Sequence, residues 1–282
     1  MPRTRFPSSC IATATGAAPD PALRIPSPKV VTSLPSPFPS PRGPSGSRRD
    51  SEEALFTLLP SGISVFAMDF AGSGLSDGKW VTLGAREVDD LEAVVKFLRT
   101  RPFVSTIGLW GRSMGAVTAL LYAHRDPTVA GIVLDSPFSR LTDLMMEIVA
   151  HQVRTRAVTR YKQARARDAA PHWERRETGR PRLQPQRISI PKSLLKIALA
   201  MMRRSVRKRA GFDLTKVAPI DTAPEAFIPA LFSHAQGDDF VPKHHSERLQ
   251  KAYGGDSNYS ERPGVCSHVS SILQMARINS NA

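Results

Sequence analysis

Short apolar runs alternate with amphipathic segments along the chain from about residue 53. Three runs have the length and composition of buried strands: "ISVFAMDF" (63–70), "TIGLWG" (106–111) and "VAGIVLDSPF" (129–138). The segment "VDDLEAVVKFLRT" (88–100) instead spaces its apolar residues three and four apart, which is the period of one helix face. Apolar strands that alternate with helices predict parallel βαβ units, and so an α/β fold with a mostly parallel sheet and helices on both faces.

Residues 140–210 interrupt this alternation. The stretch 153–187 has few large apolar residues and predicts a loop or a solvated helix, whereas "SLLKIALAMMRRSVRKRAG" (193–211) predicts a helix with a basic second half. The alternation then resumes with a strand and loop in "FIPALFSHAQGDDFVP" and a helix in "KHHSERLQKAY". We therefore expect a single α/β domain over 51–282 that carries a basic cap or insert at 140–210.

The first 50 residues have neither a helical nor a strand period. They contain 11 of the 24 prolines of the chain and only two acidic residues. Proline removes a backbone donor, so we expect residues 1–50 to form a largely disordered Pro/Ser-rich segment. The Arg and Ser bias is also typical of an organelle transit peptide. The expected location is cytoplasmic, or organellar if this segment is such a peptide.

Charge and composition exclude several classes of function. Residues 154–210 hold 18 Lys and Arg against 3 Asp and Glu. Their net charge of 18 − 3 = +15 exceeds the net charge of +14 of the whole chain. Because the positive charge belongs to one segment, we expect no nucleic-acid binding. No apolar run approaches the roughly 18 residues that span a bilayer. The two cysteines suggest neither a disulfide framework nor a metal cluster, and no residue pattern calls for a cofactor.

The sequence "GRSMG" (111–115) lies between a predicted strand and a predicted helix. In that context G-x-S-x-G predicts a nucleophile elbow, in which a strained turn presents Ser113 to a substrate carbonyl. Gly111 and Gly115 then mark a close approach of strand and helix that leaves no room for Cβ atoms. The N–H of Met114, at the helix N-terminus, is the expected oxyanion donor. The simpler alternative is an ordinary tight turn.

A serine nucleophile needs a base and an orienting acid. The acid should follow a later strand, and "AQGDDFVP" supplies Asp238, with Asp239 as second choice and Asp135 as third. A solvated turn with two acids is the alternative to a catalytic role. His268 is the candidate base because it follows the acid on a loop. Three other histidines have positions typical of packing or surface residues: His234, His244 and His245.

Four stretches together resemble the α/β-hydrolase superfamily: "VFAMDFAGSGLSDG", "IGLWGRSMGAVTALLYAHRDP", "AGIVLDSPFSRL" and "PALFSHAQGDDFVPKHH". The nearest branch is the serine aminopeptidase-like and monoacylglycerol-lipase-like group, especially a eukaryotic subgroup common in plants. By motif position the resemblance implies Ser113 as the nucleophile, Met114 as the residue after it and Asp238 as the acid.

The chain departs from these relatives in two places. Where relatives carry H-G-x-S-G after a strand, this chain reads "RGPSG" (42–46) after a proline-rich stretch, and Pro44 has no N–H to donate. Near the other end, relatives follow "YxGDxN" with a strand and a G-D-H-N motif, whereas "YGGDSNYSERPG" suggests that this strand and histidine are skipped. Alignment on G-D-x-N puts Ser257 at the histidine position. Residues 153–187 also have no counterpart in the relatives.

Three readings follow from these residues. The first is a serine hydrolase that cleaves an ester, thioester or small amide of a small acyl substrate, with Ser113, Asp238 and His268 as the triad. The second is a catalytically impaired homologue with a binding role or none. The third, compatible with either, is contact with a membrane surface through the basic amphipathic segment 193–210. The alternative for this segment is a cap helix whose apolar face covers the substrate pocket.

Overall fold

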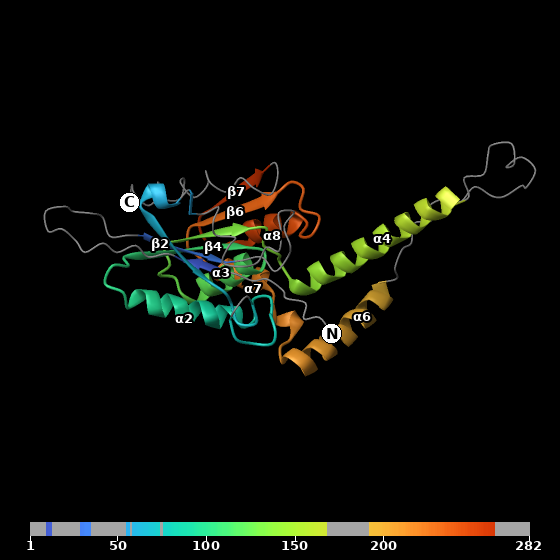
Figure 1. Ribbon diagram of the computed structural model, residues 1–282, viewed down its shortest axis with the longest axis horizontal. Helices are drawn as coiled ribbons and strands as arrows, with labels where there is room; N and C mark the ends of the chain where they lie inside the picture. Colours follow the sequence, from blue (N-terminus) through green and yellow to red (C-terminus); the bar gives the residue numbers. More distant parts are fainter. Residues whose placement is uncertain are drawn as a thin grey trace, which may run out of the picture.

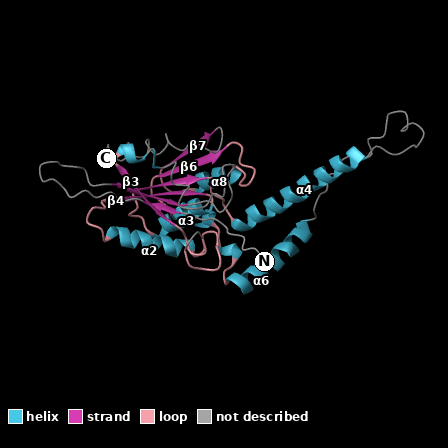
Figure 2. Ribbon diagram, in the orientation of Figure 1, coloured by secondary structure: helices cyan, strands magenta, loops and turns pink. Residues whose placement is uncertain are grey.

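A computed structural model gives the fold of the chain (Figure 1). The structure describes residues 10–12, 29–34, 55–56, 58–73, 76–167 and 192–262. Within them, strands form one layer with helices packed against it, and two longer helices extend away from it (Figure 2). The expected α/β fold is confirmed.

The sheet has seven strands among the described residues, in the order β3-β1-β2-β4-β5-β6-β7. Strands β2, β4, β5, β6 and β7 run parallel to one another, while β1 is antiparallel to both of its neighbours. Their bounds are β1 Cys10–Ala12, β2 Lys29–Leu34, β3 Ile63–Met68, β4 Thr106–Arg112, β5 Gly131–Asp135, β6 Ala230–Ala235 and β7 Ser257–Arg262. The apolar runs of the sequence therefore form the sheet, as predicted.

Strands β1 and β2 lie within the first 50 residues, which the sequence analysis expects to be largely disordered. That expectation is corrected for Cys10–Ala12 and Lys29–Leu34, and the rest of 1–50 lies outside the described residues. The segment "KVVTSL" is short, free of proline and contains β-branched residues, so it can pair in register along β4. The proline-rich stretch begins only after it, at the end where Leu34 lies beside Gly111.

Both faces of the sheet are apolar, which is why its strands read as continuous apolar runs. On one face, α2 (Glu87–Arg99), α3 (Met114–Arg125) and α8 (His244–Ala252) contribute to the largest core cluster. On the other face, Trp110, Val133 and Leu231 pack with Leu58. Four short helices lie in the connections between these elements: η2 Leu59–Ser61, η3 Leu214–Lys216, α7 Pro219–Thr222 and η4 Ala223–Glu225.

Helices α4 (Leu141–Arg167) and α6 (Lys192–Ala210) extend away from the sheet on the same side (Figure 1). The bases of the two helices join the core, because Leu144 is buried there and Met202 and Val206 pack against the same cluster. Helix α4 continues to Arg167, so the first part of 153–187 is helical, one of the two predicted states. The remainder, 168–187, lies outside the described residues.

Strand β7 corrects the expectation that a strand is skipped near the C-terminus. Ser257 begins this strand, which pairs in parallel with β6 from Ala230↔Ser257 to Ala235↔Arg262. The alignment that puts Ser257 at the histidine position is therefore wrong, because this residue lies at the amino end of a strand. Among the described residues, no helix combines the length and the apolar character needed to cross a membrane.

Candidate active site

Ser113 occupies the turn between β4 and α3. Its φ of 52° and ψ of −112° place it in a region that residues with a Cβ rarely adopt. The turn is held from both sides, because the Ser113 N–H donates to the Asp135 carbonyl at 2.7 Å and the Ser113 carbonyl accepts from the Val117 N–H at 3.0 Å. The predicted strand–serine–helix geometry is therefore present.

Glycine is required at position 111 by contact between β4 and α3. A Cβ built on Gly111 would lie 2.2 Å from the Gly115 carbonyl carbon and 2.4 Å from the Ala116 nitrogen. Such distances are far below van der Waals contact, so strand and helix could not approach as they do. The predicted close approach at the first glycine of "GRSMG" is confirmed.

The Ser113 hydroxyl is enclosed. The residue is 4 % exposed, and its Oγ has no hydrogen-bond partner among the described residues. Two cavities of about 580 and 480 Å³ open beside α6, and Ser113 lines neither. In this conformation the Ser113 side chain is almost fully covered.

Met114 is the first residue of α3 and is fully buried. The first N–H groups of a helix have no partner within the helix, and the helix dipole adds partial positive charge there. An oxyanion at Ser113 would meet this end of α3. The geometry is compatible with the expected donor role, and the "RGPSG" stretch (42–46) that would carry the second donor lies outside the described residues.

Asp238 and Asp239 follow β6 at the same edge of the sheet as Ser113. Asp238 is half-buried, and its Oδ1 accepts the N–H groups of Phe240 and Val241, both at 2.9 Å. Its Oδ2 makes none of these bonds, whereas Asp239 is exposed. A carboxylate held in one orientation by the backbone suits an orienting acid, so the geometry favours Asp238 over Asp239.

Asp135, the third candidate acid, is engaged elsewhere. It ends β5 as a buried residue, and its Oδ2 accepts from Arg112 Nε at 2.7 Å. Because Arg112 immediately precedes Ser113, this ion pair fixes β4 and β5 together at the turn. This pair was not predicted from sequence, since the two residues are 23 positions apart and meet only in the sheet.

The histidines near the acid loop have partners that make them unsuited to act as the base. His234 is fully buried, with Nε2 donating to the Val241 carbonyl at 2.8 Å and Nδ1 lying 2.7 Å from Ser246 Oγ. It thus holds the loop that carries Asp238, whose Oδ2 lies 3.9 Å away. His268, the candidate base, lies outside the described residues.

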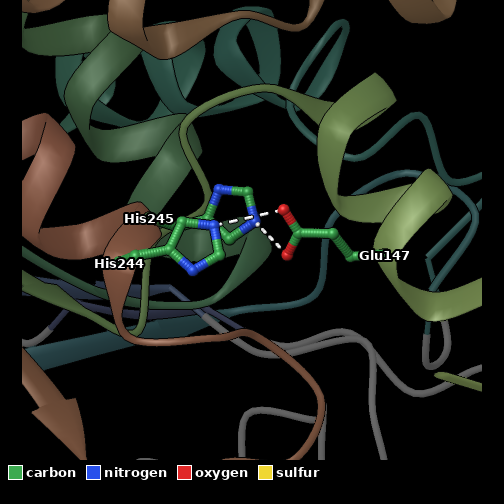
Figure 3. Close-up of side chains that lie close together, drawn as sticks. All are labelled: Glu147, His244 and His245. Carbon is green, nitrogen blue, oxygen red and sulfur yellow. Dashed lines mark hydrogen bonds and ion pairs between the residues drawn. The ribbon is translucent and has the colours of Figure 1, made fainter. Parts of the chain in front are cut away.

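His244 and His245, at the start of α8, meet Glu147 of α4 (Figure 3). The Nε2 atoms of His244 and His245 lie 3.1 and 3.3 Å from the two carboxylate oxygens of Glu147. Burial lowers the pKa of His245, against the opposing effect of the Glu147 carboxylate, so its imidazole is neutral at pH 7. From sequence, both histidines are interpreted as packing or surface residues, and the only signal of this cluster is the pair of adjacent histidines after the acid loop.

A family model described as serine aminopeptidase, S33, matches residues 50–266. The chain belongs to this family of α/β-hydrolases. The match covers most of the chain, including the Ser113 turn, the acid loop and β7. The resemblance to the α/β-hydrolase superfamily and to its serine aminopeptidase family is thus confirmed, whereas the eukaryotic, plant-type subgroup is not supported by the similar proteins found.

One curated relative is the uncharacterized protein YqkD of Bacillus subtilis (strain 168), 29 % identical over 209 residues. The match covers 73 % of this chain and 56 % of YqkD, so the chain spans about half the length of that relative.

Among solved structures, the esterase Pf2001 of Pyrococcus furiosus has 16 % identity and a TM-score of 0.48, with 81 % of this chain and 74 % of Pf2001 covered. Est1E of Butyrivibrio proteoclasticus bound to ferulic acid has 19 % identity and the same TM-score, with 83 % and 81 % covered.

Proposed function

We propose that this chain is a serine hydrolase that cleaves an ester, thioester or small amide through an acyl-enzyme at Ser113. The observation that carries the proposal is the strained φ of Ser113 between β4 and α3, in a chain that belongs to a hydrolase family. A non-glycine residue with this backbone conformation is costly unless the surrounding structure imposes it, and such strain is concentrated at functional sites.

The proposed reaction uses a triad of Ser113, Asp238 and His268. Ser113 Oγ forms a bond to the substrate carbonyl carbon while its proton passes to the imidazole of His268, and the Met114 N–H stabilises the oxyanion. The imidazolium then protonates the leaving group as the carbonyl carbon–leaving-group bond breaks. Water deprotonated by the same imidazole hydrolyses the acyl-enzyme. His268 follows the carboxyl end of β7, which lies beside the end of β6 that leads to Asp238, and this order supports its role.

Helices α4 and α6 are the proposed cap of this domain. They enter the fold between β5 and β6, and their bases belong to the same apolar cluster as Val117 of α3, one turn after Ser113. In this position the two helices would border the substrate site beside the Ser113 turn. Which acyl group fits would then depend on the side chains that these helices present to the site. A small acyl group, such as the ferulic acid bound to Est1E, is the expected class of ligand.

A catalytically impaired homologue is the alternative. Pro44 lacks an N–H where relatives have the second oxyanion donor, and loss of one such donor costs about 10²–10³ in rate. The enclosed Ser113 hydroxyl also fits a site that no longer turns over substrate.

Labelling with a fluorophosphonate probe distinguishes the two. We expect wild-type protein to be labelled at Ser113 and Ser113→Ala to remain unlabelled. Asp238→Asn should slow labelling at least about tenfold, because the base loses its orienting acid, while the exposed neighbour Asp239→Asn should label at nearly the wild-type rate. Absence of labelling in wild-type protein that retains its circular dichroism and cooperative unfolding would favour the impaired homologue.

We also propose that α6 contacts anionic membrane surfaces. Leu194, Ile197 and Met201, on the face predicted to be apolar, are 57 %, 55 % and 64 % exposed, so within the described residues this face does not cover a pocket. The following turns of α6 are basic, and a helix with an exposed apolar face and basic residues is suited to lie on anionic lipid.

A further inference from the structure

We infer that Glu147, His244 and His245 form a binding site for a divalent first-row transition metal ion, with Zn²⁺ as the expected occupant. Their ligand atoms all lie within 4.8 Å of one another (Figure 3). Two imidazoles and one carboxylate form a donor set that binds Zn²⁺ in proteins, with three protein ligands and one open position. Nothing in the proposed hydrolase mechanism uses these three residues.

The spacing of the three side chains fits a single ion. Ligand atoms around a tetrahedral Zn²⁺ with bonds of about 2.1 Å lie about 3.4 Å apart. Nε2 of His244 lies 3.1 Å from Glu147 Oε1, and Nε2 of His245 lies 3.3 Å from Glu147 Oε2, so each imidazole has a carboxylate oxygen near this spacing and the carboxylate would hold the ion between them. The two imidazole rings are stacked, with centroids 4.5 Å apart, and both face the carboxylate from α8 (Figure 3).

A buried nitrogen without a hydrogen-bond partner points into this site. His245 is fully buried, and the polar neighbour of its Nε2 among the described residues is the Glu147 carboxylate, whose Oε2 lies 3.3 Å away, outside good hydrogen-bond geometry. Burying an unsatisfied ring nitrogen is costly, and metal coordination would satisfy it. His244 and Glu147 remain partly exposed, which leaves a path for the ion to enter.

The outer surroundings of His245 also suit a metal ligand. Its Nδ1 lies 2.8 Å from Ser139 Oγ. The Ser139 N–H also donates to this Nδ1, at 3.3 Å. Metal binding at Nε2 would therefore move the ring proton to Nδ1, where Ser139 Oγ would accept it in place of the N–H contact, an arrangement that fixes ring orientation in many metal sites. Arg248, the nearby cation of α8, is paired with Asp143 of α4 at 3.6 Å, which reduces its repulsion of the ion.

The ion would join α4 to α8, and so fix the base of the proposed cap beside the helix that follows the acid loop. Its effect should therefore appear as thermal stabilisation of the whole protein. This inference does not depend on hydrolase activity, because metal binding and unfolding are measured without a substrate.

The test uses the full, untagged chain freed of metal, titrated with Zn²⁺ by calorimetry and with Co²⁺ by visible absorption. We expect one ion per chain, d–d bands from bound Co²⁺ and a rise in Tm with Zn²⁺. His244→Ala and Glu147→Gln, which alter partly exposed side chains, should abolish all three signals. Ser139→Ala should weaken binding about 10–100-fold.

His124→Ala is the matched control, because His124 pairs with Glu225 at 3.4 Å on the surface without a third ligand among the described residues. It should bind both ions as wild-type protein does. Absence of binding by wild-type protein would overturn the inference and leave an ordinary His–Glu contact. Binding that survives in both His244→Ala and Glu147→Gln would overturn it equally, by placing the ion elsewhere.

Discussion

Ser113 is one of three non-glycine residues with positive φ in the described part of the chain, and its ψ of −112° lies outside the left-handed helical region. A Cβ in such a conformation costs on the order of 1–3 kcal/mol, which the hydrogen bonds on either side of the turn must sustain. The strain can be isolated by comparing two variants that both lack the hydroxyl group.

We expect Ser113→Gly to be more stable than Ser113→Ala by about 1 kcal/mol. Glycine removes the Cβ strain, and this gain exceeds the roughly 0.5–1 kcal/mol that glycine loses in backbone entropy. Urea unfolding monitored by circular dichroism measures the difference. At an ordinary position an alanine variant is more stable than a glycine variant. If Ser113→Ala proved more stable than Ser113→Gly, the turn would not be strained.

At the scale of residues, the sequence predicts what depends on neighbours along the chain. "GRSMG" predicts both the Ser113 turn and the contact at Gly111, because strand, turn and helix are consecutive. The Arg112–Asp135 pair and the Glu147 cluster could not be predicted in this way, since their members meet only when β5 pairs with β4 and α4 lies beside α8. Sequence spacing does not encode such contacts.

At the scale of elements, Asp126 links the end of α3 to the end of α2. It pairs with Arg99 at 2.8 Å and accepts hydrogen bonds from Tyr122 at 2.6 Å and Thr128 at 2.7 Å. Burial alone would raise the pKa of the Asp126 carboxyl, but these hydrogen bonds from Arg99, Tyr122 and Thr128 outweigh it and hold the pKa well below its usual value.

The free energy of unfolding should therefore fall in acid through Asp126. A carboxyl with a lowered folded-state pKa stabilises the protein above its unfolded pKa of about 3.9 and loses that contribution as pH decreases toward 2. We expect Asp126→Asn to be less stable than wild type by about 1–2 kcal/mol at pH 7 and to approach wild type near pH 2.

Urea unfolding at a series of pH values measures this convergence. Asp89→Asn, which removes an exposed pair with Arg125, should differ little from wild type at any pH. Stability curves of Asp126→Asn and wild type that stay parallel down to pH 2 would contradict the prediction.

The helices and strands from residue 63 to 138 were predictable because apolar period and turn residues agree there. Strand β2 escaped prediction because six extended residues lie in a proline-rich surrounding, and β7 because "SNYSER" has little apolar content at the edge of the sheet. The length of α4 also escaped, since its polar second half buries no face that the sequence could reveal.

At the scale of the whole molecule, the charge of the chain is concentrated in the region that extends from the sheet. Arg203 of α6 is bound to Asp213, and among the described residues no other basic side chain of α6 forms an ion pair with an acid. The rest of the chain, outside 154–210, has a formal net charge of −1, so an anionic surface would attract the molecule at one end and orient it.

We expect the protein to sediment with vesicles containing about 30 % phosphatidylserine at low salt and to be released at about 0.5 M salt, because each basic residue near the surface contributes about 1 kcal/mol. The double variant Ile197→Glu with Met201→Glu should bind at least about tenfold more weakly. Phe56→Glu, at an exposed apolar position outside α6, is the control. Background sedimentation of wild-type protein at low salt would exclude the membrane contact.

The place of β1 and β2 inside the sheet bears on where the chain can be shortened. The region matched by the family begins at residue 50, after both strands, yet β1 joins β3 to β2 and β2 joins that half to β4. If the chain were shortened to the matched region, β3 would lose its pairing with β1, and β4 would lose its pairing with β2 and become an edge strand. Two rows of unpaired backbone groups would then face solvent, a surface that recruits other chains into aggregates. The boundary recognised by sequence similarity is thus a poor place to cut this protein.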